Sequence, residues 1–432
     1  MALAGDVFTE VRAPRARIRV PAGGNAGQAY AIIAGQSDNS IATTNQFPCK
    51  EWSITDDMMT LADAASVVIA NVNGENADKF YIGQRIEIDE SDPDVAHGAW
   101  VRHFTGRVTA VNPGSDKGGG STINISAMDL GWHLTSCHAP PLKNIKGIKF
   151  GKLLDILIDP SWGIQSITDN AIRNTRLKHA RQVIVQNYKP VLGAILPYIQ
   201  VEPGQAPFDI LRTYAQREGF LINVGARGEL IFFRPQYDMD PLYNFVYRSS
   251  NDPARNTNNL LGRPTLRVSL DEVYSEVQCW STVVIPPEIQ NTENPNEAYR
   301  YTSYKPPTNP LPFYRLHVFS DPEAITEKMR RNRAIWKYQM GLFNSWQYDI
   351  EVKGHSQGGA FFVSNTMASV QDDINGVPAG AYYVQRVQRS FDKDGIKSKL
   401  TIRRPGLLDP ELDAFRVGAG ARAAAKIPEA RA

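Results

Sequence analysis

EPGQAPFDILRTYAQREGFLINVGARGELIFFRP, residues 202–235, joins a short amphipathic helix to a tight strand pair. Pro207 suits the first helical turn, and apolar residues follow at helical spacing. These residues are Phe208, Leu211 and Ala215. Gly219 can end the helix in a left-handed conformation before the apolar run 220–224. A turn at 226–228, in which Gly228 is free to take positive φ, then leads into a return strand at 229–233.

Strand signals lie on both sides of this unit. Alternating apolar and polar residues predict one antiparallel β domain over 15–135, with strands at 17–20, 52–55, 67–70, 85–89, 102–111 and 122–127. The pattern returns from about residue 260 and predicts a second barrel or sandwich, with strands at 265–270, 274–284, 313–319, 346–352, 382–387 and 397–403. Between the two, a second apolar stripe predicts another short helix, formed by Phe150, Leu153, Leu154 and Leu157. Residues 140–240 are therefore expected to form a compact α+β insertion.

Bulk composition narrows the class of protein. The 432 residues suffice for two to four domains with their own cores. Lys and Arg (47) nearly balance Asp and Glu (45), so composition gives no argument for a nucleic-acid binder and favours a partner recognised by shape. Cys49, Cys137 and Cys279 are far apart and offer neither a disulfide framework nor a CxxC metal knuckle. The sequence shows neither a secretion signal nor a membrane-spanning run, so we expect the chain to stay in the cytoplasm where it is made.

Three segments carry a family resemblance. The first is the stretch 202–235, and the second, at 320–354, is the helix SDPEAITEKMRRNRAIWKYQM followed by the strand WQYDIEVKG. The third covers 81–129, with YIGQRIEIDESD, HFTGRVTAV and STINISAMD in that order. By their sequences and by their order along the chain, these segments resemble the baseplate hub proteins of contractile-tailed bacteriophages, the Mu-like tail protein P and late control protein D families.

The resemblance implies a mainly β fold with an α+β insertion, made of two tail-tube-like antiparallel β-barrels plus a small helix-and-strand domain. The implied division places the first tube-like barrel at 1–135, the α+β insertion at 136–250, the second tube-like barrel with a helix at 321–341 in 251–408, and a flexible C-terminal tail at 409–432.

The same resemblance implies a structural role. Three copies would form a homotrimeric ring of six barrels that adapts the hexameric tail tube to the trimeric central spike, and DNA would pass only as the genome in the lumen. The expected partners are the tail tube protein, a separate central spike protein and other baseplate proteins, with no membrane insertion. The expected location is the virion baseplate after assembly in the cytoplasm of the bacterial host. No enzyme activity, cofactor, metal, or catalytic or cofactor-binding residue is expected.

The enzyme alternative depends on Ser356. Gly354-His355-Ser356-Gln357-Gly358 is a G-x-S-x-G sequence, which marks the nucleophile elbow of an α/β-hydrolase. In that fold the catalytic His follows the Ser along the chain, yet the last histidine here is His355. The following residues predict a strand rather than the helix that an elbow opens. We therefore expect a β-turn at these glycines, and keep a serine hydrolase as the alternative function.

A receptor-binding or carbohydrate-binding β protein is the other alternative. Its binding surface would be the aromatic row that contains Trp346 and Tyr348, although burial in a barrel is the simpler use of these side chains. The long stretch 286–312, rich in Pro, Asn and Tyr, is expected to be a loop that lies against a neighbouring subunit. Its aromatic residues and those just after it would otherwise be exposed: Tyr299, Tyr301, Tyr304, Phe313 and Tyr314.

The helix after this loop carries a capping pattern and a charged face. Ser320 and Glu323 form a capping box, and an apolar stripe follows, formed by Ile325, Met329, Trp336 and Met340. We expect a solvated face for its basic residues, although an acidic partner or passing DNA could also contact them. These residues are Arg330, Arg331, Arg333 and Lys337.

Two further groups of polar residues have a structural explanation. The pairs Asp56-Asp57 and Asp372-Asp373 lack a nearby histidine or a calcium-loop pattern, so we expect them to be solvated at turns and strand ends. His133 and His138 flank Cys137 without a second ligand cluster. Stacking or hydrogen bonding within the domain connection is therefore expected rather than a zinc site.

Overall fold

The structure is a computed structural model of the whole chain. It describes residues 15–20, 29–33, 49–71, 79–115, 121–140, 145–164, 195–199, 201, 203–217, 220–233, 235, 237, 239–248, 258–281, 300–307, 309–322, 324 and 326–405. Several predictions from sequence lie outside these residues: the end of the first helix at Gly219, the roles of Tyr299, Glu323 and Ile325, and the C-terminal tail 409–432.

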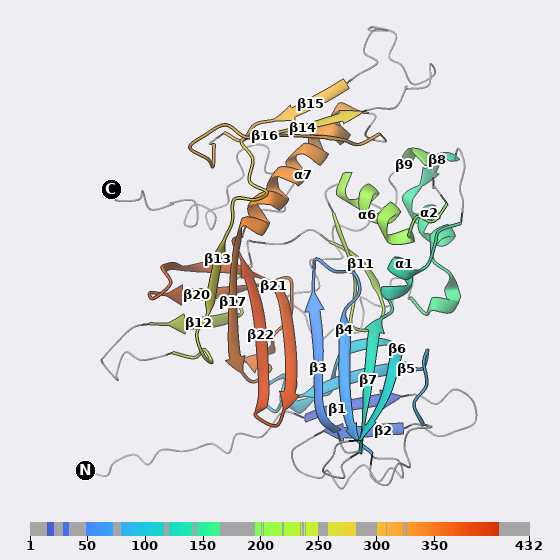
Figure 1. Cartoon of the computed structure of the whole chain (residues 1–432), viewed down its shortest axis with the longest axis vertical. Coiled ribbons are helices and arrows are strands. Elements are labelled where there is room, and N and C mark those ends of the chain that lie inside the picture. Colours follow the sequence, from blue (N-terminus) through green and yellow to red (C-terminus); the bar gives the residue numbers. More distant parts are fainter. Residues whose placement is uncertain are drawn as a thin grey trace.

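Thirteen strands form one large sheet, mostly antiparallel, which dominates the lower part of Figure 1. Its path runs β13-β17-β22-β21-β3-β4-β7-β6-β5-β1-β2, and β20 leaves it at β21 to pair with β12. The strands from the first third of the chain are β1 (Arg15–Val20), β2 (Ala29–Ile33), β3 (Cys49–Asp57), β4 (Ala64–Ala70), β5 (Arg85–Ser91), β6 (Val101–Ser115) and β7 (Ser121–Asp129). Those from the last half are β12 (Tyr243–Tyr247), β13 (Thr265–Val268), β17 (Trp346–Lys353), β20 (Thr366–Asp372), β21 (Val377–Asp392) and β22 (Gly395–Arg403).

The two predicted β regions are parts of this one sheet, because β3 pairs antiparallel with β21 from Trp52–Phe391 to Asp57–Arg386. Each region also has its own apolar core: one contains Ile86, Ile88 and Phe104, and the other Tyr348, Val384 and Ile402. The predicted mainly β fold is confirmed, and both β regions are barrel-like. Among the described strands, however, neither region closes on itself.

A compact α+β part, at the upper right of Figure 1, packs beside the first β region. Its elements are α1 (Trp132–Ser136), β8 (Ile145–Lys149), α2 (Phe150–Leu157), η4 (Pro160–Trp162), β9 (Ile195–Ile199), α6 (Pro207–Arg217), β10 (Leu221–Val224) and β11 (Leu230–Phe233). The predicted helix and hairpin are confirmed: α6 begins at Pro207, and β10 pairs antiparallel with β11. Gly228 has φ +88°, and a Cβ there would lie 2.5 Å from the side chain of Leu130, so the turn needs glycine for both conformation and space.

The third part is a small sheet covered on one face by a long helix, at the top of Figure 1. The strands run β15 (Arg300–Tyr304), β14 (Glu276–Ser281) and β16 (Leu316–Ser320), and the helix is α7 (Glu327–Ser345). Between the helix and the sheet, Val277, Cys279 and Ala334 are buried in one cluster. The remaining described elements are short: η3 (Ala96–Gly98), β18 (Ser356–Gln357) and β19 (Ala360–Phe361).

Two sequence predictions about this third part were wrong. The helix was expected at 321–341 with Ser320 as its cap, but Ser320 is the last residue of β16, and Thr326 caps α7 by accepting a hydrogen bond from the Met329 N–H at 3.2 Å. Residues 286–312 were expected to be a loop, yet this range contains β15, which pairs with β14. In both cases pairing with a strand distant in sequence decides the local structure.

Candidate functional site

The G-x-S-x-G sequence forms a β-hairpin turn. Ser356 pairs with Phe361 and Gln357 with Ala360, so Gly358 and Gly359 make a two-residue turn with φ of +61° and +80°. Positive φ at both central residues is the geometry that favours glycine in tight hairpins. The expected turn is confirmed, and the next elements are β19 and β20 rather than the helix of a hydrolase elbow.

Among the described residues, Ser356 makes no hydrogen bond to a histidine, the base of a hydrolase triad. Its hydroxyl donates a hydrogen bond to the carboxylate of Asp92. The adjacent imidazole of His355 is buried, with Nδ1 3.2 Å from Glu90 Oε2 and Nε2 3.0 Å from the carbonyl of Ser390. Both ring nitrogens therefore contact other groups, and the contacts of Ser356 link the β18 hairpin to the segment after β5.

A buried ionic cluster holds the two β regions together next to this hairpin. Arg389, on β21, is 1% exposed, and its Nη1 lies 2.8 Å from His103 Nδ1 and donates to the carbonyl of Phe362 at 3.2 Å. Its Nε lies 3.6 Å from Glu90 Oε1. Glu90 and His103 come from the first β region and Arg389 from the second. The cluster therefore joins the regions beside their β3–β21 pair.

The charges in this cluster keep Glu90 ionised although it is buried. Burial alone would raise the pKa of this carboxyl, but the charges of Arg389, His355 and His103 act in the opposite direction. The pKa of Glu90 is consequently well below its ordinary value. An ionised carboxylate in this position needs Arg389, because an unpaired buried charge is strongly unfavourable.

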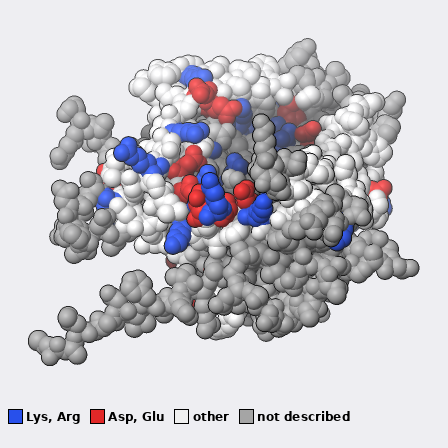
Figure 2. Space-filling model, turned by 60° about the horizontal axis from the view of Figure 1, so that its bottom comes forward, with Lys and Arg blue, Asp and Glu red and all other residues white. Residues whose placement is uncertain are grey.

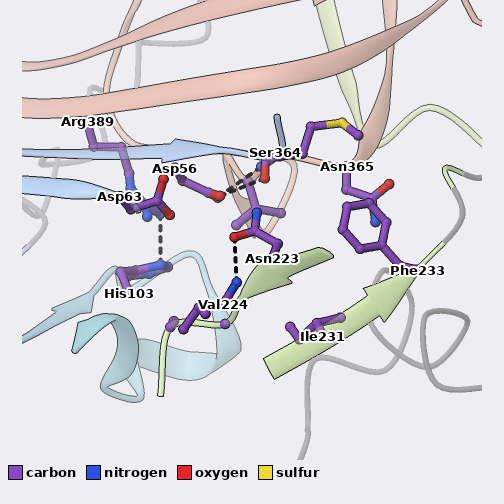
Figure 3. Close-up of a pocket in the computed structure, with 14 residues that line it drawn as sticks. Asp56, Asp63, His103, Asn223, Val224, Ile231, Phe233, Ser364, Asn365 and Arg389 are labelled. Atoms are coloured by element: carbon purple, nitrogen blue, oxygen red, sulfur yellow. Dashed lines mark hydrogen bonds between the residues drawn. The ribbon is translucent and has the colours of Figure 1, made fainter. Parts of the chain in front are cut away.

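A cavity of about 80 Å³ lies beside the cluster, shown in Figure 3. Its lining combines polar and apolar residues. They are Asp56, Met58, Asp63, His103, Asn223, Val224, Gly225, Ala226, Ile231, Phe233, Val363, Ser364, Asn365 and Arg389. Two of the lining residues are joined directly, since Ser364 donates its N–H and hydroxyl to Asp56, at 3.0 and 2.6 Å. A few waters fit in this volume, whereas sites for small molecules usually enclose about 300–1,000 Å³. The cavity is therefore too small for an ordinary substrate.

Burial also affects aspartates near the cavity. Burial raises the pKa of Asp129 well above its ordinary value, and the charge of Asp56 acts in the same direction. Burial likewise raises the pKa of Asp63, with Asp56 and Asp129 adding to it. Within the described residues, His, Cys, Asp and Glu side chains form no group of three suited to a metal ion. Because their pKa values are raised in the folded protein, Asp63 and Asp129 make the free energy of unfolding depend on pH.

Replacing Asp129 by Asn should stabilise the protein at pH 8 and have little effect at pH 4. A carboxyl whose folded pKa is raised contributes stability below its unfolded pKa, and this contribution is lost as pH rises through the folded pKa. Asn removes that loss, which is about 1.4 kcal/mol for each unit of pKa shift. Urea unfolding at the two pH values measures the effect, with the exposed Asp155→Asn as control. An equal effect of Asp129→Asn at both pH values contradicts the prediction.

One aspartate of each pair is buried at a turn, whereas Asp373 is exposed as expected and Asp56 is half-buried. Asp57 is 7% exposed and accepts hydrogen bonds from the Met59 N–H at 2.9 Å and the Gln385 amide at 3.3 Å. Asp372 is fully buried, and it accepts the Ile374 N–H at 2.9 Å and the Tyr348 hydroxyl at 2.7 Å. The predicted turn and strand-end positions are confirmed, but the predicted solvation is wrong for Asp57 and Asp372, because each carboxylate satisfies a backbone N–H group as its strand ends.

The histidines around Cys137 make the predicted contacts. His133 stacks on Trp162, with ring centroids 5.7 Å apart and planes inclined by 10°, and His138 Nδ1 lies 3.0 Å from the carbonyl of Gly204. Burial and the nearby Arg107 lower the pKa of His133. Both histidines therefore connect α1 to other parts of the α+β unit.

On α7, Arg331 is exposed as expected of a solvated face, but the other three basic residues differ from that expectation. Arg330 is 3% exposed and donates to the Thr302 hydroxyl and the Ala324 carbonyl, both at 3.3 Å. Arg333 pairs with Asp321 at 2.9 Å, and Lys337 pairs with Glu272 at 3.4 Å. These three cations bind within the chain and hold α7 in place, which is a use that a charge run does not reveal in the sequence.

The surface has mixed charges. Figure 2 shows the lower face of Figure 1, where Lys and Arg side chains are interspersed with Asp and Glu. Over the described residues visible there, no extensive region carries positive charge alone, which fits the small net charge of +2. This face does not have the basic stripe typical of a protein that binds nucleic acid. No helix in the described part of the chain is long and apolar enough to cross a bilayer.

Comparisons with known proteins identify the fold. No protein-family model and no curated protein sequence matches the chain. Among solved structures, it is similar to the tail protein from Neisseria meningitidis MC58, with TM-score 0.63 and 18% identity over 91% of this chain and 98% of that one. It is equally similar to the 43 kDa tail protein of prophage MuSo2 from Shewanella oneidensis, with TM-score 0.63 and 18% identity over 91% and 99% of the two chains. A chain of the Francisella PdpA-VgrG complex gives TM-score 0.52 and 11% identity over 93% of this chain and 53% of that one. The protein thus shares its fold with phage tail proteins.

Proposed function

We propose that this chain is the structural hub of a contractile phage tail baseplate. In this proposal three copies form a pseudo-sixfold ring, which adapts a hexameric tail tube to a trimeric central spike and leaves an open lumen for the passing genome. Its partners are the tube protein, the spike protein and other baseplate proteins, and it assembles in the host cytoplasm before it becomes part of the virion. The fold shared with two phage tail proteins over more than nine-tenths of the chain supports this role.

The observation that carries the proposal is a repeated strand order. The first β region runs β3-β4-β7-β6-β5, and the second runs β13-β17-β22-β21-β20, with every neighbouring pair antiparallel. A chain with two similar β units supplies six units when three copies associate. Such a ring can meet a sixfold tube on one side and a threefold spike on the other.

The repeat also supports the proposed division of the chain into tube-like units at 1–135 and 251–408, with the α+β insertion at 136–250. In this arrangement the insertion lies at the periphery of the ring or on its spike-facing side.

The proposed role needs no catalytic residue, and the geometry favours neither alternative function. Ser356 contacts a carboxylate rather than the histidine that a hydrolase elbow requires, and the cavity is too small for a substrate. Trp346 and Tyr348, the aromatic row considered for sugar binding, are 4% and 0% exposed. Neither ring can stack on a ligand from solvent in this conformation, so these two residues do not form a binding surface for sugar.

Light scattering coupled to size-exclusion chromatography tests the proposed trimer. We expect a particle of three times the chain mass of 48.0 kDa when the chain trimerises alone, or a heavier complex that contains three chains when the tube and spike proteins are added. The trimer should bind both proteins at once, because the adapter role needs two different faces. The spike alone and the tube alone are the matched controls. A chain that stays monomeric in every mixture would contradict the hub proposal.

A further inference from the structure

The two β regions correspond residue by residue, not only in strand order. The hairpins β6–β7 and β21–β22 each pair a long first strand with a nine-residue second strand, and each has one irregularity in register. In the first hairpin the irregularity lies between Val108 and Ala110, and in the second between Val384 and Arg386. Aligning these bulges makes Ala110 the counterpart of Arg386, since bulges are specific structural features rather than random defects.

The correspondence continues outward across the sheet. Residues that lie opposite one another on adjacent strands form a row across the sheet. The row Val111–Ile125–Val67 in the first region matches the row Val387–Leu400–Ile350 in the second. One strand further, Ile54 of β3 lies opposite Ala65, and Leu266 of β13 lies opposite Tyr348, which is the counterpart of Ala65. The strand β13 is therefore the counterpart of β3, with Leu266 in the position of Ile54.

Within the chain, the second part of β21 pairs with β3. Residues 377–384 of β21 pair with β20, and residues 386–391 pair with β3, with Val387 opposite Asp56 and Arg389 opposite Ile54. This intrachain junction defines how one β unit docks on the next.

In this junction β21 and β3 contribute the paired edges, and their counterparts are the edges of residues 110–115 of β6 and of β13; among the described strands, nothing pairs with either counterpart edge. The strand β5 pairs with β6 only up to Arg107, so residues 110–115, here called distal β6, have β7 on one side and no described strand on the other. The strand β13 ends the path of the large sheet. Val268 at its end is 65% exposed and Leu270 just after it is 51% exposed. Unpaired edges with exposed apolar residues attract another strand, so a protein that stays soluble must cover them.

We propose that β13 of one copy pairs antiparallel with distal β6 of the next copy, in the register of the intrachain β3–β21 junction. The counterparts then place Val268 opposite Val111, Arg267 opposite Asn112, and Leu266 opposite Pro113. A proline is tolerated in distal β6 because it lies on a strand edge rather than in the middle of a sheet. The partner is a second copy of this chain, and the inference rests on the proposed ring.

The geometry of the repeat is the reason for this choice of partner. One copy offers β13 and the other offers distal β6, so the interface is heterologous, and repeating it closes a ring or extends a filament. The same register is already used between the two β units of one chain. A ring of three copies then contains six junctions of one kind, three within chains and three between them, which is what a pseudo-sixfold collar requires.

Disulfide cross-linking between two separately prepared variants tests the register. We expect Val268→Cys protein mixed with Val111→Cys protein to give a covalent dimer under mild oxidation, because these residues lie directly opposite each other. Each variant alone should give no dimer above the parent chain, which carries the background of Cys49 and Cys137. A chain carrying both substitutions should give covalent dimers and trimers on a non-reducing gel.

A shifted pair provides the register control. Mixing Val268→Cys with Asn112→Cys moves the second thiol to the opposite face of the strand, so we expect at least about tenfold less cross-linked dimer. A trimer by light scattering with no Val268–Val111 cross-link overturns this inference and leaves the hub proposal intact. A chain that remains monomeric with tube and spike proteins overturns both. Cross-linking of either single variant with itself shows an isologous contact and also overturns the inference.

Discussion

Replacing Arg389 by Met should destabilise the protein by about 3–5 kcal/mol, the usual result of removing one partner of a buried ion pair. Arg389 is 1% exposed, and two of its contacts join the β regions: His103 at 2.8 Å and Glu90 at 3.6 Å. It also donates to the Phe362 carbonyl at 3.2 Å. Met fills a similar volume, so the loss comes from the uncompensated Glu90 carboxylate rather than from a void. Urea or guanidinium unfolding, followed by circular dichroism, measures it.

The pH dependence identifies the cause. Without Arg389, the burial of Glu90 acts against a weaker opposing charge, so its folded pKa rises. A raised folded pKa means that stability is lost as pH rises through it, and the variant should therefore lose more at pH 8 than at pH 4.5. Adding Glu90→Gln should recover part of the loss at pH 8. The control is Lys399→Met, whose exposed ammonium lies 3.9 Å from Glu351 and should contribute no more than about 1 kcal/mol. An equal loss for the two single variants would count against a buried charge as the cause.

Local sequence pattern was enough to predict most of the strands and two helices. Alternation predicted β4 and β17, and helical spacing predicted α2 and α6, because each of these elements has one buried side and one more exposed side. Gly228 was recognised because a short turn between two apolar runs needs positive φ. These elements are decided by contacts close in sequence.

Elements that depend on distant partners were missed or misplaced. The strand β12 was not predicted, since its partner is the parallel strand β20, more than a hundred residues later. The start of α7 was placed at Ser320 because the capping box there is a valid local pattern. In the fold, Ser320 pairs opposite Trp280 in the small sheet, and this pairing outweighs the local preference.

The ionic cluster was also missed, because its members are almost 300 residues apart in the sequence. Each reads singly as an ordinary charged residue of a strand. One signal was present: Arg389 follows Val387 by two positions, so it lies on the same face of β21 as that fully buried valine. A charged residue on the inward side of an alternating strand predicts a buried partner. The sequence does not identify which carboxylate that partner is.

Replacing Gly341 by Ala should destabilise the protein by about 1–3 kcal/mol or more, as overpacking of a filled interior does. Gly341 is buried in α7, and a Cβ there would lie 1.9 Å from the carbonyl oxygen of Glu272 and 2.9 Å from its carbon. These are backbone atoms of the turn before β14, so they cannot move aside as a flexible side chain would. The helix and the small sheet must separate to admit one methyl group.

The sign of this effect distinguishes close packing from helix propensity. In a free helix, Ala is more favourable than Gly by about 1 kcal/mol, so a helix without the Glu272 contact would be stabilised by the change. We expect loss instead, measured as a lower midpoint of denaturant unfolding. Lys328→Ala, at an exposed position of the same helix, is the matched control and should change stability by no more than about 0.5 kcal/mol. If Gly341→Ala proved as stable as the parent, α7 would not pack on the turn at Glu272 as closely as the structure shows. The helix α7 would then be held against the small sheet by the Arg333–Asp321 and Lys337–Glu272 pairs instead.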